Sequence, residues 1–223
     1  MNAREIDRHS AARRGRRPSP EQTRKTEAAI LAAAVELFLE VGFAETRMEE
    51  IAARADVAKG TLYRYFPTKA AMLEAVLTQV IAGPLVGIST LPFNEGEPVQ
   101  AFLRRVLLPV LRKVKGSQLE GLFRLIIVEA TRHPEIAAVY RRTVLDPMTA
   151  FLRSLAIRAR EGGELRSNST ALERFPLLLM APGLMATAWN GLHGKEDQIS
   201  AGDAFEALLE LVFLDEERGS ALR

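Results

Sequence analysis

The sequence of 223 residues contains no cysteine and only three histidines. The missing cysteine excludes a disulfide framework, a thiolate nucleophile and a thiolate metal site. No HExxH, GxSxG or P-loop motif occurs, and no GxGxxG follows a strand-like segment. The sequence therefore predicts no catalytic residues, no cofactor and no metal site. A helical-bundle enzyme remains a competing interpretation, without a motif to support it.

Long apolar runs and signal features are also missing. The stretch from Leu177 to Trp189 is shorter than the roughly 18 residues that suggest a membrane span, and the N-terminus has no apolar signal-peptide core. We therefore expect a cytoplasmic protein with no membrane partner. Aromatic residues make up only 6% of the chain, whereas alanine, leucine, glutamate and arginine are abundant, which favours an all-α fold.

Charge is unevenly distributed, although the net charge is only +2. Residues 1–20 carry six arginines against Glu5 and Asp7, and residues 54–69 carry four bases against Asp56 alone. Both excesses lie in the first third of the chain, which is typical of a region that binds an anionic partner. We interpret residues 1–18 as a flexible basic arm that either contacts a nucleic acid or solubilises the protein.

Helix signals divide the rest of the chain into two modules, 19–82 and 83–223. The first module is expected to hold helices over residues 20–41, 46–55, 59–65 and 68–80. Thr46 and Thr68 are the expected caps of the second and fourth helices, and Asp56 is expected to make a left-handed turn between the second and the third. The turn-rich segment from Gly83-Pro84 to Gly96 marks the boundary.

The second module is predicted to be helical throughout. Its expected helices cover residues 98–115, 117–133, 134–161, 170–192 and 201–217. Pro109 is expected to bend the first of these, and Asp146-Pro147 to kink the third. The last two are apolar on more than one side, so they either close the core of the monomer or pair with a second copy in a four-helix dimer interface.

The segment KGTLYRYF, residues 59–66, decides the function of the first module. Two short helices joined by a tight turn are the layout of a helix-turn-helix. At 100° per residue, Leu62 and Phe66 point into the core and Arg64 points away from it. We predict that Arg64 and Thr61 contact base edges in a DNA major groove and that Gly60 allows a close approach. Phosphates are expected to contact Lys59, Tyr63, Tyr65, Lys69 and the backbone amides near Thr46.

Residues 23–77, TRKTEAAILAAAVELFLEVGFAETRMEEIAARADVAKGTLYRYFPTKAAMLEAVL, resemble the DNA-binding domain of TetR-family transcriptional regulators. The resemblance implies an all-α homodimer that places two recognition helices in successive major grooves of a near-palindromic operator. It also implies a C-terminal domain that binds a small-molecule effector and supplies the dimer interface. That domain is similar in pattern to the AefR-like subgroup. The chain departs from the family at Asp56, where glycine is common, and at Ala58, where serine is usual.

The resemblance implies a ligand-responsive regulator, most simply a repressor released from DNA by an effector. A regulator without an effector, a nonspecific DNA binder and a membrane-surface protein are the alternatives. The expected effector is largely apolar. Its candidate contacts are Phe123, His133, Tyr140, Met148, Phe151, Met185 and Trp189, although residues of these types in a helical domain more often belong to the ordinary core or to a helix boundary.

Overall fold

The computed structural model describes residues 19–167, 170–193 and 197–214. The predicted basic arm, residues 1–18, lies outside this range, as does the end of the last predicted helix. The fold is all-α, as the composition predicts. Within the described ranges the one β-type pairing is an isolated bridge between Leu165 and Phe213.

The first four helices are α1 (Pro20–Val41), α2 (Met48–Arg54), α3 (Lys59–Tyr65) and α4 (Lys69–Leu77). The predicted Thr68 cap is confirmed, because its hydroxyl accepts a hydrogen bond from the Ala71 amide at 3.1 Å. Ser19 caps α1 in the same way, and its hydroxyl accepts a hydrogen bond from the Gln22 amide at 3.2 Å. Asp56 has φ 51°, which confirms the left-handed turn between α2 and α3.

The prediction that Thr46 caps α2 is wrong. Its side chain is buried, and its hydroxyl donates a hydrogen bond to the Gly42 carbonyl at 2.7 Å. The helix begins two residues later, and the Glu50 carboxylate accepts a hydrogen bond from the Arg47 amide at 3.4 Å. Thr46 therefore closes the turn after α1 rather than starting α2.

Lys69 ties this turn to α4. Its ammonium donates hydrogen bonds to the carbonyls of Phe43 at 2.7 Å, Ala44 at 2.8 Å and Thr46 at 3.0 Å, and it lies 4.7 Å from the centre of the Phe43 ring. All three N–H donors of the ammonium are thus used within the protein. Burial lowers the pKa of Lys69 below its ordinary value.

The helix that begins at Lys69 runs past the predicted module boundary. The π-helical turn η1 (Thr78–Ala82) and α5 (Gly83–Ser89) continue α4 without a break. By length and composition, this 21-residue helix is long and apolar enough to cross a membrane. Its uncharged part, from Ala75 to Ser89, is longer than the stretch from Leu177 to Trp189 that was considered from the sequence as a possible membrane span. Its N-terminal half packs Met72, Leu73 and Val76 into the core with no exposure, as expected of a linking helix in a folded domain.

The remaining elements are α6 (Val99–Val106), α7 (Leu108–Arg112), α8 (Gln118–Glu129), α9 (Pro134–Tyr140), η2 (Arg141–Leu145), α10 (Asp146–Glu161), α11 (Ala171–Arg174), η3 (Pro176–Met180), α12 (Ala181–Leu192) and α13 (Ala201–Val212). The break before Pro109 agrees with the predicted bend. The helix predicted over 170–192 is instead three pieces, since Pro176 interrupts it with a 3-10 turn.

Two π-helical turns precede prolines in the same way. In η1 the amide of Gly83, the residue before Pro84, donates to the Thr78 carbonyl, and in η2 the amide of Asp146, before Pro147, donates to the Arg141 carbonyl. A proline collides with the carbonyl four residues earlier in a regular α-helix, and a π turn relieves this collision without ending the helix. At Asp146-Pro147, where a kink is predicted, the helix instead continues through this π turn, and η1 and η2 lie against each other.

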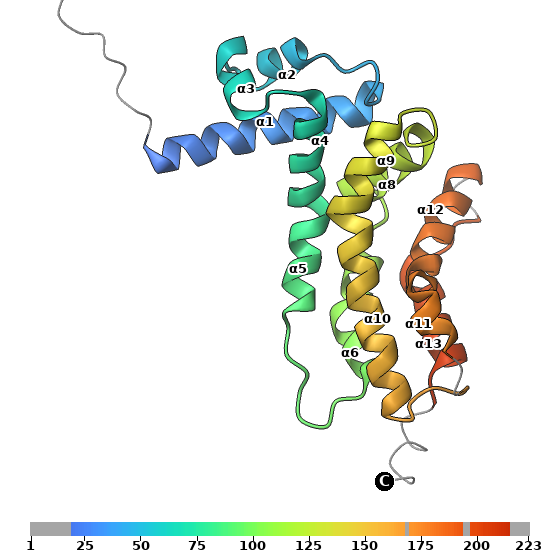
Figure 1. The fold of residues 1–223 in the computed structure, drawn as a ribbon. Helices are drawn as coiled ribbons and strands as arrows, with labels where there is room; N and C mark the ends of the chain where they lie inside the picture. The colour runs from blue at the N-terminus through green and yellow to red at the C-terminus, as the bar shows by residue number, and fades with distance from the viewer. Residues whose placement is uncertain (1–18, 168–169, 194–196, 215–223) are drawn as a thin grey trace, which may run out of the picture.

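The helices enclose two cores. The first surrounds Phe38 and Leu62 and continues into the second module through Ile126, Ile136 and Val139. The second surrounds Phe102, Leu152 and Phe205. Figure 1 shows α1 lying across the end of the bundle, with α2 and α3 on the side of α1 that faces away from α8 to α13. The first core therefore joins the helix-turn-helix to the larger module.

We predict that Lys69→Met lowers the free energy of unfolding by about 2 kcal/mol, because three carbonyls lose a charged hydrogen-bond donor. Urea denaturation followed by circular dichroism measures this change. Lys59→Met is the matched control, since the ion pair of Lys59 with Glu49 and its contact with the Tyr63 ring are both at the surface, and it should leave stability nearly unchanged. Equal urea midpoints for wild type and Lys69→Met would contradict the structural role of Lys69.

Candidate nucleic-acid interface

The recognition helix α3 presents one face to the core and the other to solvent. Leu62 is completely buried and Phe66 nearly so, whereas Lys59, Gly60, Tyr63 and Arg64 are exposed. Phe66 has left helical geometry, with φ −132° and ψ 96°, as expected for a residue before proline. Figure 1 shows α3 at one end of the molecule, uncovered by the larger module. The face predicted to meet DNA is therefore accessible.

Gly60 lies in open space. A Cβ atom built on it meets no atom of the described protein within 4 Å, and its φ is not in the left-handed region. Neither packing nor backbone strain therefore requires glycine in this helix, where alanine would be more favourable. A requirement for a missing side chain at this position would come from a partner outside the chain.

Arg64 is the cation of α3 that the described protein leaves unpaired. Its guanidinium lies 5.6 Å from the centre of the Tyr65 ring, and no carboxylate holds it in an ion pair within the described residues. By contrast, Arg54 on α2 pairs with Glu40 at 2.6 Å. The five N–H donors of Arg64 are thus available to an external acceptor.

Glu49 on α2 is a residue of this face that the sequence analysis missed. Its Oε1 atom lies 2.7 Å from the Lys59 ammonium and accepts a hydrogen bond from the Tyr63 hydroxyl at 3.3 Å. The hydrogen bond from Lys59 holds the pKa of Glu49 below its ordinary value. Glu49 therefore positions two of the predicted phosphate contacts. An acidic residue ten positions from a lysine gives no periodic signal, so only the fold shows the pairing.

The side chains at three other predicted positions are turned toward the protein, while the predicted phosphate contact of the backbone amides near Thr46 stays a prediction. Lys69 donates to the turn after α1, as described above, and the Thr46 side chain is buried. Tyr65 is half-buried against the first core, and its hydroxyl lies 3.5 Å from the Thr23 carbonyl. The structure thus brings Gly60, Arg64 and the pair of Lys59 and Tyr63 together on one surface with half-buried Thr61, and separates the side chains of Thr46, Tyr65 and Lys69 from it.

The seven predicted effector contacts are not gathered at one place. Tyr140 packs against the first core, where burial raises its pKa to about 12, while Met148 and Phe151 belong to the second core. Met185 and Trp189 are on the outer face of α12. The other two are half-buried: Phe123 lies in α8, and His133 precedes α9 with Nε2 3.6 Å from Glu129 Oε2.

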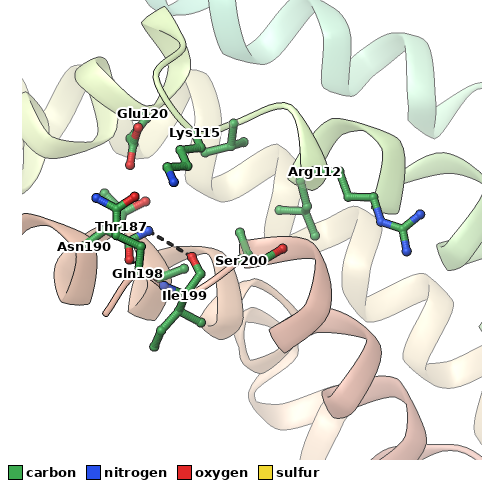
Figure 2. Close-up of a pocket in the computed structure, with 12 residues that line it drawn as sticks. Arg112, Lys115, Glu120, Thr187, Asn190, Gln198, Ile199 and Ser200 are labelled. Atoms are coloured by element: carbon green, nitrogen blue, oxygen red, sulfur yellow. Dashed lines mark hydrogen bonds between the residues drawn. The ribbon is translucent and has the colours of Figure 1, made fainter. Parts of the chain in front are cut away.

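A cavity of about 170 Å³ does occur in the larger module, but at another position. It lies between the segment from α7 to α8 and the segment from α12 to α13 (Figure 2). None of the seven predicted residues lines it. Its walls come from segments about 70 residues apart in sequence. The periodicity of apolar residues does not indicate which segments so far apart come into contact, so the cavity could not be predicted from the sequence.

Both halves of the chain match known protein families. Residues 30–76 match the family described as bacterial regulatory proteins, tetR family, and residues 97–201 match the family described as tetracyclin repressor-like, C-terminal domain. An HTH-type transcriptional regulator of Mycobacterium bovis is 31% identical over 161 residues, which cover 72% of this chain and 75% of that protein.

Solved structures share the fold. The SmeT–triclosan complex superposes with a TM-score of 0.70 at 21% identity, covering 86% of this chain and 93% of SmeT. NalD, described as the secondary repressor of the MexAB-OprM multidrug efflux pump in Pseudomonas aeruginosa, has a TM-score of 0.67 at 21% identity, covering 86% of this chain and 99% of NalD.

The accessible α3 face, the turn at Asp56 and these relatives define a helix-turn-helix DNA-binding protein. The chain belongs to the TetR family of bacterial transcriptional regulators. Members of this family bind operator DNA and small-molecule effectors and form dimers. Membership of the C-terminal domain in the AefR-like subgroup stays a prediction.

We predict that Gly60→Ala separates folding from DNA binding. The unfolding free energy should be unchanged or higher by up to about 1 kcal/mol, because alanine favours the helix and nothing in the protein obstructs its Cβ. Affinity for the DNA fragment that the wild-type protein selects should fall at least about tenfold, which is roughly 1.4 kcal/mol. Fluorescence anisotropy and urea denaturation measure the two quantities. Unchanged DNA affinity would show that the duplex does not approach Gly60.

Proposed function

We propose that this protein is a homodimeric, sequence-specific repressor that a small-molecule effector releases from a near-palindromic operator. The observation that carries the proposal is the composition of the α3 face, which offers an unpaired guanidinium beside a glycine that the fold itself does not need. An exposed helix with these features suits insertion into a major groove. Operator DNA would place the protein in the bacterial cytoplasm.

The outward-facing side chains of α3 have separate roles in this proposal. Arg64 donates two hydrogen bonds to the O6 and N7 atoms of a guanine, and Thr61 contacts a neighbouring base edge. Lys59 and Tyr63, held in place by Glu49, contact phosphates and fix the register of the helix. Lys69 and Tyr65 support the domain from within instead of contacting DNA.

A dimer is supported by an apolar face, which we define as Leu184, Met185, Trp189 and Leu192 of α12 together with Leu211 of α13. Each of these side chains is at least 41% exposed in the single chain. The two helices pack against each other, and exposed large apolar side chains on neighbouring helices are typical of a protein interface. Pairing of α12 and α13 with their symmetry mates would cover it and would set the separation of the two α3 helices at about one DNA turn, roughly 34–36 Å, or somewhat more.

Effector control is supported by contacts between the two modules. Glu129, the last residue of α8, accepts a hydrogen bond from the Phe43 amide at 3.0 Å, directly after Gly42. Gly42 has φ 88°, and a Cβ there would lie 2.7 Å from the same carboxylate oxygen. A shift of α8 would therefore move the turn that precedes α2. SmeT, which has the same fold, is known in complex with triclosan, and NalD is a repressor. A coupling free energy of about 1–3 kcal/mol changes operator affinity roughly 5- to 150-fold.

The decisive test of DNA recognition is selection of fragments from genomic DNA by the purified protein and by its Arg64→Ala variant. We expect the wild type to select fragments that share a near-palindrome, and Arg64→Ala to bind them about 5- to 150-fold more weakly, since one bidentate guanine contact is worth about 1–3 kcal/mol. Arg24→Ala, which removes an arginine from α1 and not from α3, is the control. Equal selection by the wild type and Arg64→Ala would refute base reading by Arg64.

The dimer interface has its own test. Met185→Glu places a charge in the apolar face and should convert the protein to a monomer in analytical ultracentrifugation, because an unpaired buried charge is strongly unfavourable. Val86→Glu changes an exposed apolar residue of α5 that lies outside the face, and it should leave the dimer intact. If both variants keep the wild-type mass, the two copies meet elsewhere.

A further inference from the structure

The cavity between α7 and α13 has the features of a binding site for a small anion. We propose that it binds a short-chain carboxylate, with the carboxylate group at Lys115 and Thr187 and the hydrocarbon chain against Leu111, Val114 and Ile199. This inference deepens the proposed function, on which it rests for its regulatory meaning, because it names the class of molecule that the larger module senses.

Thr187 places a hydroxyl group on the wall of the cavity. The residue is only 7% exposed, and it lines the cavity on the α12 side. Among the described residues, the buried hydroxyl without a hydrogen-bond partner is that of Thr143 in η2, so the Thr187 hydroxyl is not a buried atom left unsatisfied by the fold. A hydroxyl on a cavity wall can donate a hydrogen bond to a carboxylate oxygen.

The charge of the lining favours an anion. The Lys115 ammonium forms no ion pair within the described part of the chain, and Figure 2 shows it extending between the two walls toward Thr187 and Asn190. Glu120 is the acid of the lining, and one of its oxygens is already 2.6 Å from the Gly116 amide. The guanidinium of Arg112 points away from the other labelled side chains in Figure 2. The first turn of the 12-residue helix α13, at Ala201, adds a positive dipole end.

The wall formed by residues 197–200 is fixed in place by α12. The Asn190 amide donates to the Ile199 carbonyl at 2.9 Å and accepts from the Ile199 amide at 2.8 Å, and the Trp189 indole donates to the Asp197 carbonyl at 2.7 Å. The site is therefore formed before a ligand arrives, which avoids an ordering cost on binding.

The volume sets the size of the ligand. A space of 170 Å³ is smaller than the roughly 300–1,000 Å³ of sites for drug-sized molecules and corresponds to about five or six waters at about 30 Å³ each. A carboxylate with about four carbon atoms fits this space. Such a ligand would bridge the start of α8, whose other end contacts Phe43, and α12, which carries the apolar face.

The test uses the full-length protein with sodium butyrate as the probe and butyramide as a neutral molecule of nearly the same shape, at constant ionic strength. Binding is measured by NMR titration with folding checked by circular dichroism. We expect saturable butyrate binding to the wild type in the millimolar range, and at least tenfold weaker binding of butyramide. Lys115→Gln should weaken butyrate binding at least tenfold and Thr187→Val about threefold or more, whereas Lys113→Gln, which removes a neighbouring exposed lysine outside the cavity, should have no effect.

Three results would overturn the inference: no saturable butyrate binding by the folded wild type, equal binding of butyrate and butyramide, or undiminished binding by folded Lys115→Gln. Preferential binding of inorganic phosphate would also overturn it, since the ligand class would then be wrong. The proposed function is judged separately by DNA selection without butyrate. Failure of that selection would remove the repressor and leave the ligand site to be decided by the titration alone.

Discussion

The orientation of α3 depends on the burial of Leu62 and Phe66. A helix of seven residues is too short to be stable alone in water, so it exists because its inward face completes the first core. That core fixes which residues face outward, and hence where Arg64 points. The tie from Lys69 to three carbonyls holds the neighbouring turn against α4, so the start of α2 is set by the same packing.

The first core also explains how two functions can be linked in one chain. It contains Phe38 of α1 and Ile126 of α8, so the helix-turn-helix shares its interior with the larger module. Closely packed interiors transmit displacement instead of absorbing it. The hydrogen bond from the Phe43 amide to Glu129 adds a directional contact at the same junction. A change in the position of α8 consequently has a direct physical route to the helices that face DNA.

Most of the first module could be predicted from the sequence because its signals are local. Ser19, Thr68 and Pro67 set the helix ends through their own backbone chemistry, and Asp56 allowed the left-handed turn to be predicted without glycine. Thr46 was assigned wrongly because a threonine before a helix has two partners available, and the choice of the Gly42 carbonyl depends on how α1 ends. Glu49 and the cavity around Thr187 were missed because they depend on contacts between segments with no common period.

The two π turns determine where this fold can accept the loss of a residue. A π turn closes its hydrogen bond over one residue more than an α turn, so η1 and η2 each store one surplus residue inside a continuous helix. Loss of a single residue between 78 and 82, with Pro84 also replaced, would return that turn to ordinary α geometry and keep both flanking segments in line. The same deletion in the middle of α10 would rotate every later side chain by about 100° around the axis. The helix from Lys69 to Ser89 could therefore lose one residue at η1, in evolution or by design, while α4 and α5 keep their structure and alignment.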